Sequence, residues 1–253
     1  MKKEEGIGWI TLNRPHRLNT MTIDMMDEFL SALNEFESDK DVKCVVITGA
    51  GEKAFSAGAD MSMFTGMTPS MATDGSIRVS GVLTKLEQIG KPVIACINGY
   101  ALGGGLELSL ACDFRIASES AQLGSPEIKL GLIPGWGATQ RLAPIVGLAK
   151  AKELVMIGDR ITAEQALKIG LVTKVVPHAK LVEETKAFAK NFIDGPPIAL
   201  KEAKHALNYG TQVPRDIGIK FEAEAIGVVA STKDLMEGVS AFMSKRKPEF
   251  KGK

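Results

Sequence analysis

Short apolar runs that end at glycine or proline mark the first half of the chain. Residues 8–15, 42–51 and 91–100 are nearly continuous apolar segments rich in β-branched side chains, and residues 113–124 form a similar segment with a turn inside it. Runs of this length and composition are typical of strands that are covered on both faces. We therefore expect a buried sheet built from these segments.

Helical spacing of apolar residues separates these runs. In residues 22–39 the apolar positions that fall on one helical face are Met26, Phe29, Leu30, Leu33 and Phe36. Thr22 is suited to cap the first turn, and a second helix is expected around residues 75–90. Strands that alternate with helices predict an α/β protein with well-covered sheets.

The pattern changes near Gly195-Pro196-Pro197. From there to the end, only helical patterns occur, separated by glycine and proline. We predict an α/β core over residues 1–195 and a helical region over residues 196–253. Such a region either serves interactions with other chains or packs back on its own core.

Composition narrows the function classes. Of the 253 residues, 45% are hydrophobic and 24% charged, with a formal net charge of +1, which disfavours binding to nucleic acid or a membrane surface. A local basic segment, residues 244–253, is the exception. Cys44, Cys96 and Cys112 lie in apolar runs without metal-ligand spacing, which indicates buried reduced thiols.

The sequence shows no complete signal for membrane insertion, export, a metal site or a dinucleotide site, and these absences shape the expected location and cofactors. No apolar run reaches the ~18 residues of a membrane span, and we expect neither a signal peptide nor a peroxisomal ending, so the cytoplasm is the expected location. The three histidines lie far apart in polar contexts, so no metal site is expected. Residues 49–54, GAGEKA, imitate a dinucleotide fingerprint, but no long helix pattern follows at once, so a dinucleotide site is not expected.

Residues 98–113, NGYALGGGLELSLACD, combine three consecutive glycines with one glutamate in an apolar run. Glycine where a strand meets a helix lets the backbone approach a ligand, and unpaired N–H groups there can hold a developing negative charge. Close packing of helix on strand explains the glycines equally well. Both interpretations stay open at this point.

Glu107 has no partner on its own helix, because its neighbours three and four positions away are Gly103, Gly104, Leu110 and Ala111. A buried carboxylate either has a distant partner or carries a raised pKa, and a carboxyl with a pKa near neutrality suits acid–base catalysis.

Glu127 is a second candidate carboxyl. Ser125 as cap and Pro126 at the first helical position would put it in a first turn, where acidic residues are common for dipole reasons alone. The glycine-rich segment that follows suggests a tight loop that lines something.

The sequence resembles the crotonase family, the enoyl-CoA hydratase/isomerase superfamily, over nearly its whole length. The matching segments are ITLNRPHRLNT, KAFSAGAD, KPVIACINGYALGGGLEL, GSPEIKLGLIPGWGATQRL and FMSKRKPEFKGK. This resemblance implies an α/β spiral of ββα repeats, followed by a helical C-terminal region that builds homo-trimers, often stacked into hexamers.

The resemblance also implies a chemistry. The backbone N–H groups of Ala59 and Gly104 would form an oxyanion hole for a thioester enolate. Glu107 and Glu127 match the glutamate pair of enoyl-CoA hydratases, with Glu107 holding water and Glu127 giving a proton to C2. The implied activity is reversible hydration of a trans-2-enoyl-CoA to a 3-hydroxyacyl-CoA in fatty-acid or related acyl-CoA degradation. No metal or redox cofactor is implied, since coenzyme A arrives as part of the acyl-CoA substrate.

Contacts with the substrate follow by the same resemblance. The segment expected along coenzyme A comprises Ala57, Ala59, Asp60, Met61 and Ser62. Phe242 and Lys245 match residues that meet the nucleotide end, often from a neighbouring subunit, although Lys245 could equally be a solvated charge.

Several residues depart from the family pattern. Met61, Met63, Phe64 and Met67 stand where relatives often have charged residues, and they would line the acyl pocket or pack a mobile loop. Trp136 stands where relatives often have a small residue, which would shorten the pocket and favour short acyl chains.

Two alternatives remain from the sequence. An isomerase that moves a double bond between C3 and C2 would use the same oxyanion hole with a single proton shuttle. An RNA-binding or non-catalytic member is suggested by the basic tail and opposed by the near-zero net charge.

Overall fold

Two sheets form the body of the protein, and the computed structural model describes all residues, 1–253. The larger sheet has six strands, parallel except for the first pair, in the order β1 (Lys2–Glu4), β2 (Ile7–Leu12), β3 (Cys44–Gly49), β5 (Val93–Ile97), β7 (Phe114–Ser118) and β10 (Lys174–Val176). The smaller sheet has the order β4 (Ala54–Ser56), β6 (Tyr100–Leu102), β8 (Gln122–Gly124) and β9 (Ile161–Thr162), with β4, β6 and β8 parallel and β9 antiparallel. The α/β class predicted from the apolar runs is confirmed.

The chain alternates regularly between the two sheets. β3, β5 and β7 join the larger sheet, and the strand that follows each of them, β4, β6 or β8, joins the smaller one. A helical segment comes next in each case: α2 (Pro69–Gln88), α3 (Gly104–Leu110), or a short 3₁₀ helix, η3 (Pro126–Leu130), with α4 (Ala138–Val146). This is the spiral of ββα repeats that the sequence led us to expect.

Both faces of the larger sheet are covered. In β3, Val45 and Ile47 belong to the main core with α1 (Ile23–Ser38) and α2, whereas Cys44 and Val46 pack on the other face with α7 (Leu181–Ile193). Near-continuous apolar strands are the sequence signature of such two-sided burial. All three cysteines are buried and unpaired, as predicted.

The first helix forms as its sequence predicts. The Thr22 hydroxyl accepts the Met25 N–H and so caps the first turn. Of the apolar positions on the predicted face, only Leu30 is not fully buried. The other elements of the body are η1 (Pro15–Arg17), η2 (Met61–Phe64), α5 (Leu148–Met156), α6 (Ala163–Lys168) and η4 (His178–Lys180).

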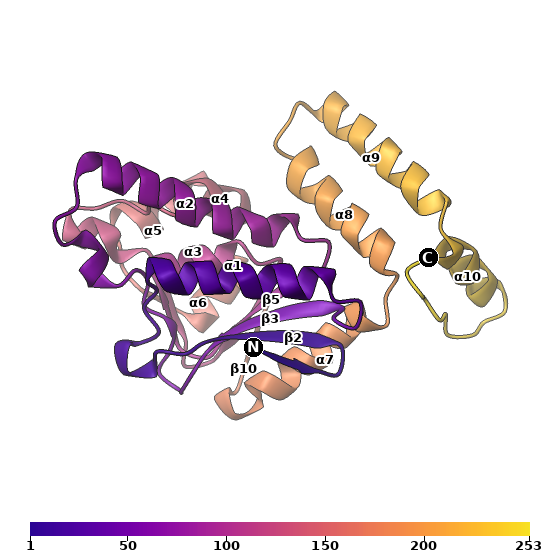
Figure 1. Ribbon diagram of the computed structural model, residues 1–253, viewed down its shortest axis with the longest axis horizontal. Coiled ribbons are helices and arrows are strands. Elements are labelled where there is room, and N and C mark those ends of the chain that lie inside the picture. The colour runs from indigo at the N-terminus through magenta and orange to yellow at the C-terminus, as the bar shows by residue number, and fades with distance from the viewer.

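Three helices follow the body, α8 (Pro197–Gly210), α9 (Arg215–Ala230) and α10 (Lys233–Met243), and they extend away from it (Figure 1). The purely helical pattern after Pro196 is thus confirmed. The division into two domains, and the role of the second in assembly, remain predictions. None of the helices combines the length and the apolar content that crossing a membrane requires.

Candidate active site

Three parallel strands of the smaller sheet bring the candidate residues together. Ala59 follows β4, Gly104 follows β6, and Glu127 follows β8. Because β4, β6 and β8 are parallel neighbours, the loops after them leave the same edge of the sheet. The Gly103 N–H donates to the Gly124 carbonyl at 3.0 Å and fixes two of these loops to each other.

The loops that carry the two backbone N–H groups expected in an oxyanion hole touch each other. Met21 pairs with the peptides on both sides of Ala59: its N–H donates to the Gly58 carbonyl at 2.8 Å, and its carbonyl accepts the Asp60 N–H at 2.9 Å. Gly104 begins α3, so its N–H has no acceptor within the helix. A Cβ atom on Gly58 would lie 3.0 Å from the Gly104 nitrogen, so the two loops touch at this point.

The three glycines of the segment meet three different neighbours. Gly103 has a φ of 55°, and Cβ atoms added to Gly104 and Gly105 would lie 2.2 Å from the Trp136 ring and 2.1 Å from the Ser56 carbonyl oxygen. Neither position can hold a larger residue without displacing its neighbour. Packing of the helix on a strand is therefore correct for Gly105, which meets β4, whereas Gly104 is crowded by the ring of a loop residue. This crowding leaves the catalytic interpretation in place, since a backbone N–H needs no side chain.

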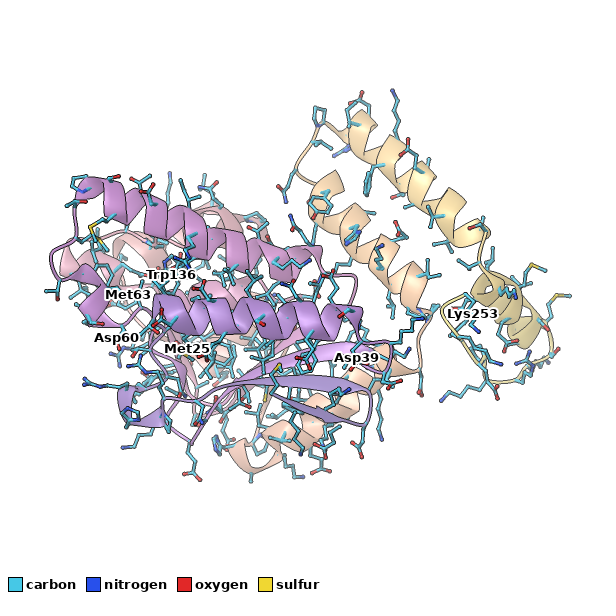
Figure 2. The ribbon with its side chains drawn as sticks, viewed as in Figure 1. Met25, Asp39, Asp60, Met63, Trp136 and Lys253 are labelled. Atoms are coloured by element: carbon cyan, nitrogen blue, oxygen red, sulfur yellow. The ribbon has the colours of Figure 1, made fainter.

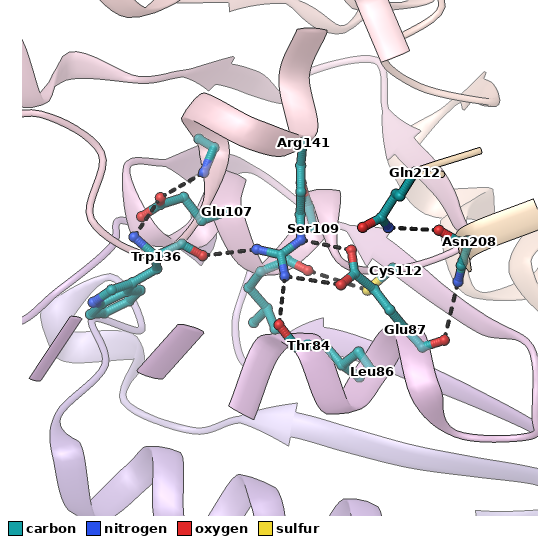
Figure 3. Close-up of polar contacts among 12 residues, drawn as sticks. Thr84, Leu86, Glu87, Glu107, Ser109, Cys112, Trp136, Arg141, Asn208 and Gln212 are labelled. Atoms are coloured by element: carbon teal, nitrogen blue, oxygen red, sulfur yellow. Dashed lines mark hydrogen bonds and ion pairs between the residues drawn. The ribbon is translucent and has the colours of Figure 1, made fainter. Parts of the chain in front are cut away.

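Glu107 is 2% exposed and has a distant partner of a kind that the sequence did not specify. Its Oε1 accepts the N–H groups of Trp136 and Ala138 at 2.8 and 2.9 Å (Figure 3). Both bonds end on one oxygen, which leaves Oε2 for another partner. Burial raises the pKa of Glu107 to about 7, the two N–H donors oppose this rise, and the nearby charge of Glu127 adds to it.

Glu127 lies in the 3₁₀ helix η3, and one local prediction about it is wrong. Ser125 precedes this helix but does not cap it; its hydroxyl instead donates to Glu127 Oε2 at 2.8 Å. An N-cap would need the Ser125 hydroxyl oxygen to accept a backbone N–H, and no such bond is present; the hydroxyl makes a charge-assisted bond to the carboxylate instead. Burial raises the pKa of Glu127, and the Ser125 bond opposes that rise.

The other oxygen of Glu127 points toward the glycine turn. Glu127 Oε1 is buried without a hydrogen-bond partner. A Cβ atom on Gly103 would lie 3.3 Å from this oxygen, so Oε1 sits beside the turn that presents the Gly104 N–H. An unpaired buried carboxyl oxygen in this position can exchange a proton with a bound molecule.

The loop expected along coenzyme A is shaped by Asp60. Its carboxylate accepts bonds from the Ser62 hydroxyl at 2.7 Å, the Ser62 N–H at 3.0 Å and the Arg14 guanidinium at 2.9 Å. These bonds hold the pKa of Asp60 far below its usual range. The Asp60 side chain is thus occupied within the protein. The contact with coenzyme A expected along the backbone of this segment, Ala57, Ala59, Asp60, Met61 and Ser62, remains a prediction.

The predicted acyl-pocket residues lie at the end of the body that also carries Asp60. Met61 is largely exposed, whereas Met63 and Phe64 are half-buried, and Met63 packs against the core. Asp60, Met63 and Trp136 all lie at this end of the molecule (Figure 2).

Phe242 and Lys245 are not part of this constellation within one chain. They lie on and just after α10, which Figure 1 places at the far side of the molecule from α3. Phe242 is 86% exposed. Their predicted role at the nucleotide end would therefore require a neighbouring subunit.

The residues that hold the two carboxyl groups were not predicted from the sequence. The donors to Glu107 are backbone groups of residues 136–138, and the segment around them was expected only to line something. Ser125 was assigned to a cap. Arg141, whose side chain reaches the Trp136 carbonyl at 2.9 Å, follows a helical pattern and gave no signal.

Comparison with known proteins gives a single answer. The model of the enoyl-CoA hydratase/isomerase family matches residues 2–253. A short-chain-enoyl-CoA hydratase of Clostridium acetobutylicum is 43% identical over 98% of this chain and 95% of its own length. A crotonyl-CoA hydratase of Syntrophomonas wolfei is 40% identical over 99% of this chain and 96% of its own length.

Solved structures agree. The crystal structure of an enoyl-CoA hydratase from Bacillus anthracis has a TM-score of 0.95 and 42% identity, and the match covers 100% of this chain and 98% of that one. The crotonase-type fold predicted from the sequence is thereby confirmed. The chain belongs to the enoyl-CoA hydratase/isomerase family.

Proposed function

We propose that the protein is an enoyl-CoA hydratase that adds water reversibly to a short trans-2-enoyl-CoA and gives a 3-hydroxyacyl-CoA. The observation that carries the proposal is a pair of carboxyl groups with raised pKa values, the buried Glu107 and the half-buried Glu127, beside the two touching loops that carry the Ala59 and Gly104 N–H groups. The hydratases named among its relatives support the same activity.

The reaction begins at the thioester carbonyl. Its oxygen accepts hydrogen bonds from the N–H groups of Ala59 and Gly104, which stabilise the enolate that forms during water addition. This polarisation draws electrons from the conjugated double bond and makes C3 electrophilic. Binding at these two groups would place the acyl chain between the carboxyl groups.

The two carboxyl groups divide the proton transfers. Glu107 as a carboxylate binds a water molecule through Oε2 and takes one of its protons while the water oxygen bonds to C3. The electron pair of the double bond passes into the enolate and returns to C2, which takes a proton from Glu127 Oε1. Glu107 ends protonated and Glu127 ionised, so the reverse reaction uses the same groups in opposite roles.

Chain length and assembly belong to the same proposal. The Trp136 ring against Gly104 would close the acyl end and favour short chains. The apolar residues exposed on α9 and α10 would lie between subunits of a trimer or hexamer, which would bring Phe242 and Lys245 to a neighbour's coenzyme A. Coenzyme A enters as part of the substrate, and the steps above use no other cofactor.

The test is loss of the enoyl-thioester absorbance of crotonyl-CoA. The wild type should remove it rapidly, and Glu107→Gln and Glu127→Gln should each lose about 10²–10⁴-fold in kcat. Glu164→Gln, in an exposed pair with Lys168 and with a side chain 75% exposed, is the matched control and should keep full activity.

Other outcomes identify the alternatives. A wild type that binds acyl-CoA without removing the absorbance would contradict the proposal. If Glu107→Gln then still shifted the double bond of a 3-enoyl-CoA, the protein would be an isomerase. RNA binding with a steep salt dependence and no hydration would favour the RNA-binding member.

A further inference from the structure

The side chain of Arg141 joins three elements near Glu107. It lies on α4, and its Nη1 donates to the Trp136 carbonyl at 2.9 Å. Its Nε and Nη2 donate to the two carboxylate oxygens of Glu87 at 2.7 and 3.0 Å, and Nη2 also contacts the Thr84 hydroxyl at 3.2 Å (Figure 3). All three nitrogens of the planar fork thus donate to fixed acceptors.

The segment that donates to Glu107 is held from two sides. Trp136 donates its N–H to Glu107 and receives the Arg141 bond on its carbonyl. Gly137, between the two donors, has a φ of 112°, and a Cβ atom there would lie 2.1 Å from Arg141 Nη1. The guanidinium therefore fills the space over Gly137 and fixes the turn that directs the N–H groups of Trp136 and Ala138 at one carboxyl oxygen.

Glu87 is itself fixed, because α8 caps the last turn of α2. The Asn208 amide donates to the Glu87 carbonyl at 3.1 Å, the Lys204 ammonium to the Leu86 carbonyl at 2.7 Å, and His205 Nε2 lies 2.8 Å from the Gln88 carbonyl. A continuous chain of polar contacts thus runs from α8 through Glu87 and Arg141 to Glu107 (Figure 3).

We propose that Arg141, oriented by Glu87, is a positioning residue that keeps the Trp136 and Ala138 N–H groups on Glu107. The proposal rests on the hydratase function above only in giving Glu107 a catalytic task. The charged groups that act on Glu107 are Glu127 on η3 and Arg141 on α4, and Glu87 on α2 faces Arg141. Burial raises the pKa of Glu107, whereas the Arg141 charge lowers it. Loss of Arg141 therefore removes the bond that holds the Trp136 segment and also the positive charge that lowers the pKa of Glu107.

The kinetic test compares Arg141→Gln, Arg141→Lys and Glu87→Gln. Arg141→Gln should lower kcat about 100-fold, the order of loss that a misplacement of about 1 Å can cause, with KM changed much less. The acidic limb of the kcat profile, which reports ionisation of Glu107, should move to higher pH. Lysine cannot bond to Trp136, Thr84 and both Glu87 oxygens at once, so Arg141→Lys should retain only part of the kcat that Arg141→Gln loses. Glu87→Gln should lower kcat about 10-fold with the same pH shift.

Arg78→Gln is the matched control. Arg78 lies on α2, the helix that also carries Glu87, and forms an exposed ion pair with Asp27 on α1. This variant should keep the wild-type kcat and pH profile. The proposal is overturned if folded Arg141→Gln matches this control, or if its kcat falls without any movement of the acidic limb. If Arg141→Gln does not fold, Arg141→Lys and Glu87→Gln decide by the same criteria.

A readout without substrate separates this proposal from the hydratase function. Trp136 is one of only two tryptophans, so Trp9→Phe leaves it as the single reporter. Its fluorescence should titrate near pH 7, should lose that transition in Glu107→Gln, and should move to higher pH in Arg141→Gln. Such a shift in a protein that does not hydrate crotonyl-CoA would sustain the positioning role while the hydratase function fails. An unmoved transition would overturn the positioning role even in an active enzyme.

Discussion

Lys204 and Asp113 form an ion pair between α8 and the loop after α3, with 2.9 Å between Nζ and Oδ2 and side chains only 7% and 15% exposed. The Asp113 carboxylate also accepts the Val93 N–H at 2.7 Å, and the Lys204 ammonium donates to the carbonyls of Leu86 and Lys91. Every donor of the ammonium is used. The first C-terminal helix is therefore bonded to the body through a satisfied buried charge pair.

Lys204→Met should lower the free energy of unfolding by about 3–5 kcal/mol, because it leaves Asp113 buried without its counter-charge. Urea denaturation measures this loss. Lys168→Met removes an ammonium from an exposed pair and should cost less than about 1 kcal/mol. Equal losses in the two variants would contradict a buried role for the Lys204 pair.

Gly104→Ala should destabilise the protein by about 1–3 kcal/mol, because its methyl group would lie 2.2 Å from the Trp136 ring. Trp136→Leu removes the obstructing ring, so the two changes together should cost clearly less than the sum of the separate losses. Thermal unfolding of the four proteins completes the cycle. Additive losses would show that the contact between residue 104 and the ring is not the source of the strain.

Trp136→Leu should also change substrate preference. If the indole closes the acyl end of the pocket, its loss should raise kcat/KM for an eight-carbon enoyl-CoA relative to crotonyl-CoA. One to three kcal/mol, about 10–200-fold, is the range that a hydrophobic pocket commonly gives for such differences. Trp9→Phe, a change in the core beneath the larger sheet, should leave the ratio unchanged. An unchanged ratio in Trp136→Leu would remove Trp136 from the acyl pocket.

Glu107 should make stability depend on pH. Its pKa is about 7 in the folded protein and near 4.5 in the unfolded chain, so the folded state holds the proton more tightly. This contribution to stability is complete below pH 4.5 and is lost as pH rises to about 7, an effect of up to about 3 kcal/mol. The free energy of unfolding of Glu107→Gln, measured in urea from pH 4.5 to 8, should lack that decline. Parallel curves for wild type and variant would contradict a raised pKa.

Phe242→Ala and Lys245→Ala should raise KM for crotonyl-CoA with little effect on kcat, because they would touch the nucleotide end and not the reacting carbons. Light scattering should give the mass of a trimer or hexamer. A monomer with normal KM would contradict both the assembly and this placement, since α10, which carries Phe242, lies far from α3, which carries Glu107, within one chain (Figure 1).

The sequence predicted the fold well because burial shapes local pattern. In the continuous β-branched run of β3 and in the Thr22-capped helix α1, the residue types themselves show which positions are buried and where the helix begins. Glu107 could be recognised as anomalous, since no residue on its helix could pair with it. Its actual donors could not be found, because backbone N–H groups 29 and 31 positions away leave no trace in residue type.

Other features escaped prediction for related reasons. Ser125 fits a helix cap and a carboxyl partner equally well by sequence, and only the 3₁₀ geometry of η3 decides between them. Arg141 looks by sequence like any other arginine in a helix, such as Arg78 or Arg215, and its importance arises from three elements that meet only after folding.

The smaller sheet has a consequence for the chemistry. Ala59 and Gly104 each follow a strand, β4 or β6, so their separation is set by how those strands are paired. A slip of one residue between β4 and β6 would move one N–H group about 3.3 Å past the other, which exceeds the length of a hydrogen bond. One oxygen atom could then no longer reach both groups. The reaction therefore depends on the alignment of two three-residue strands, which makes backbone pairing a determinant of catalysis.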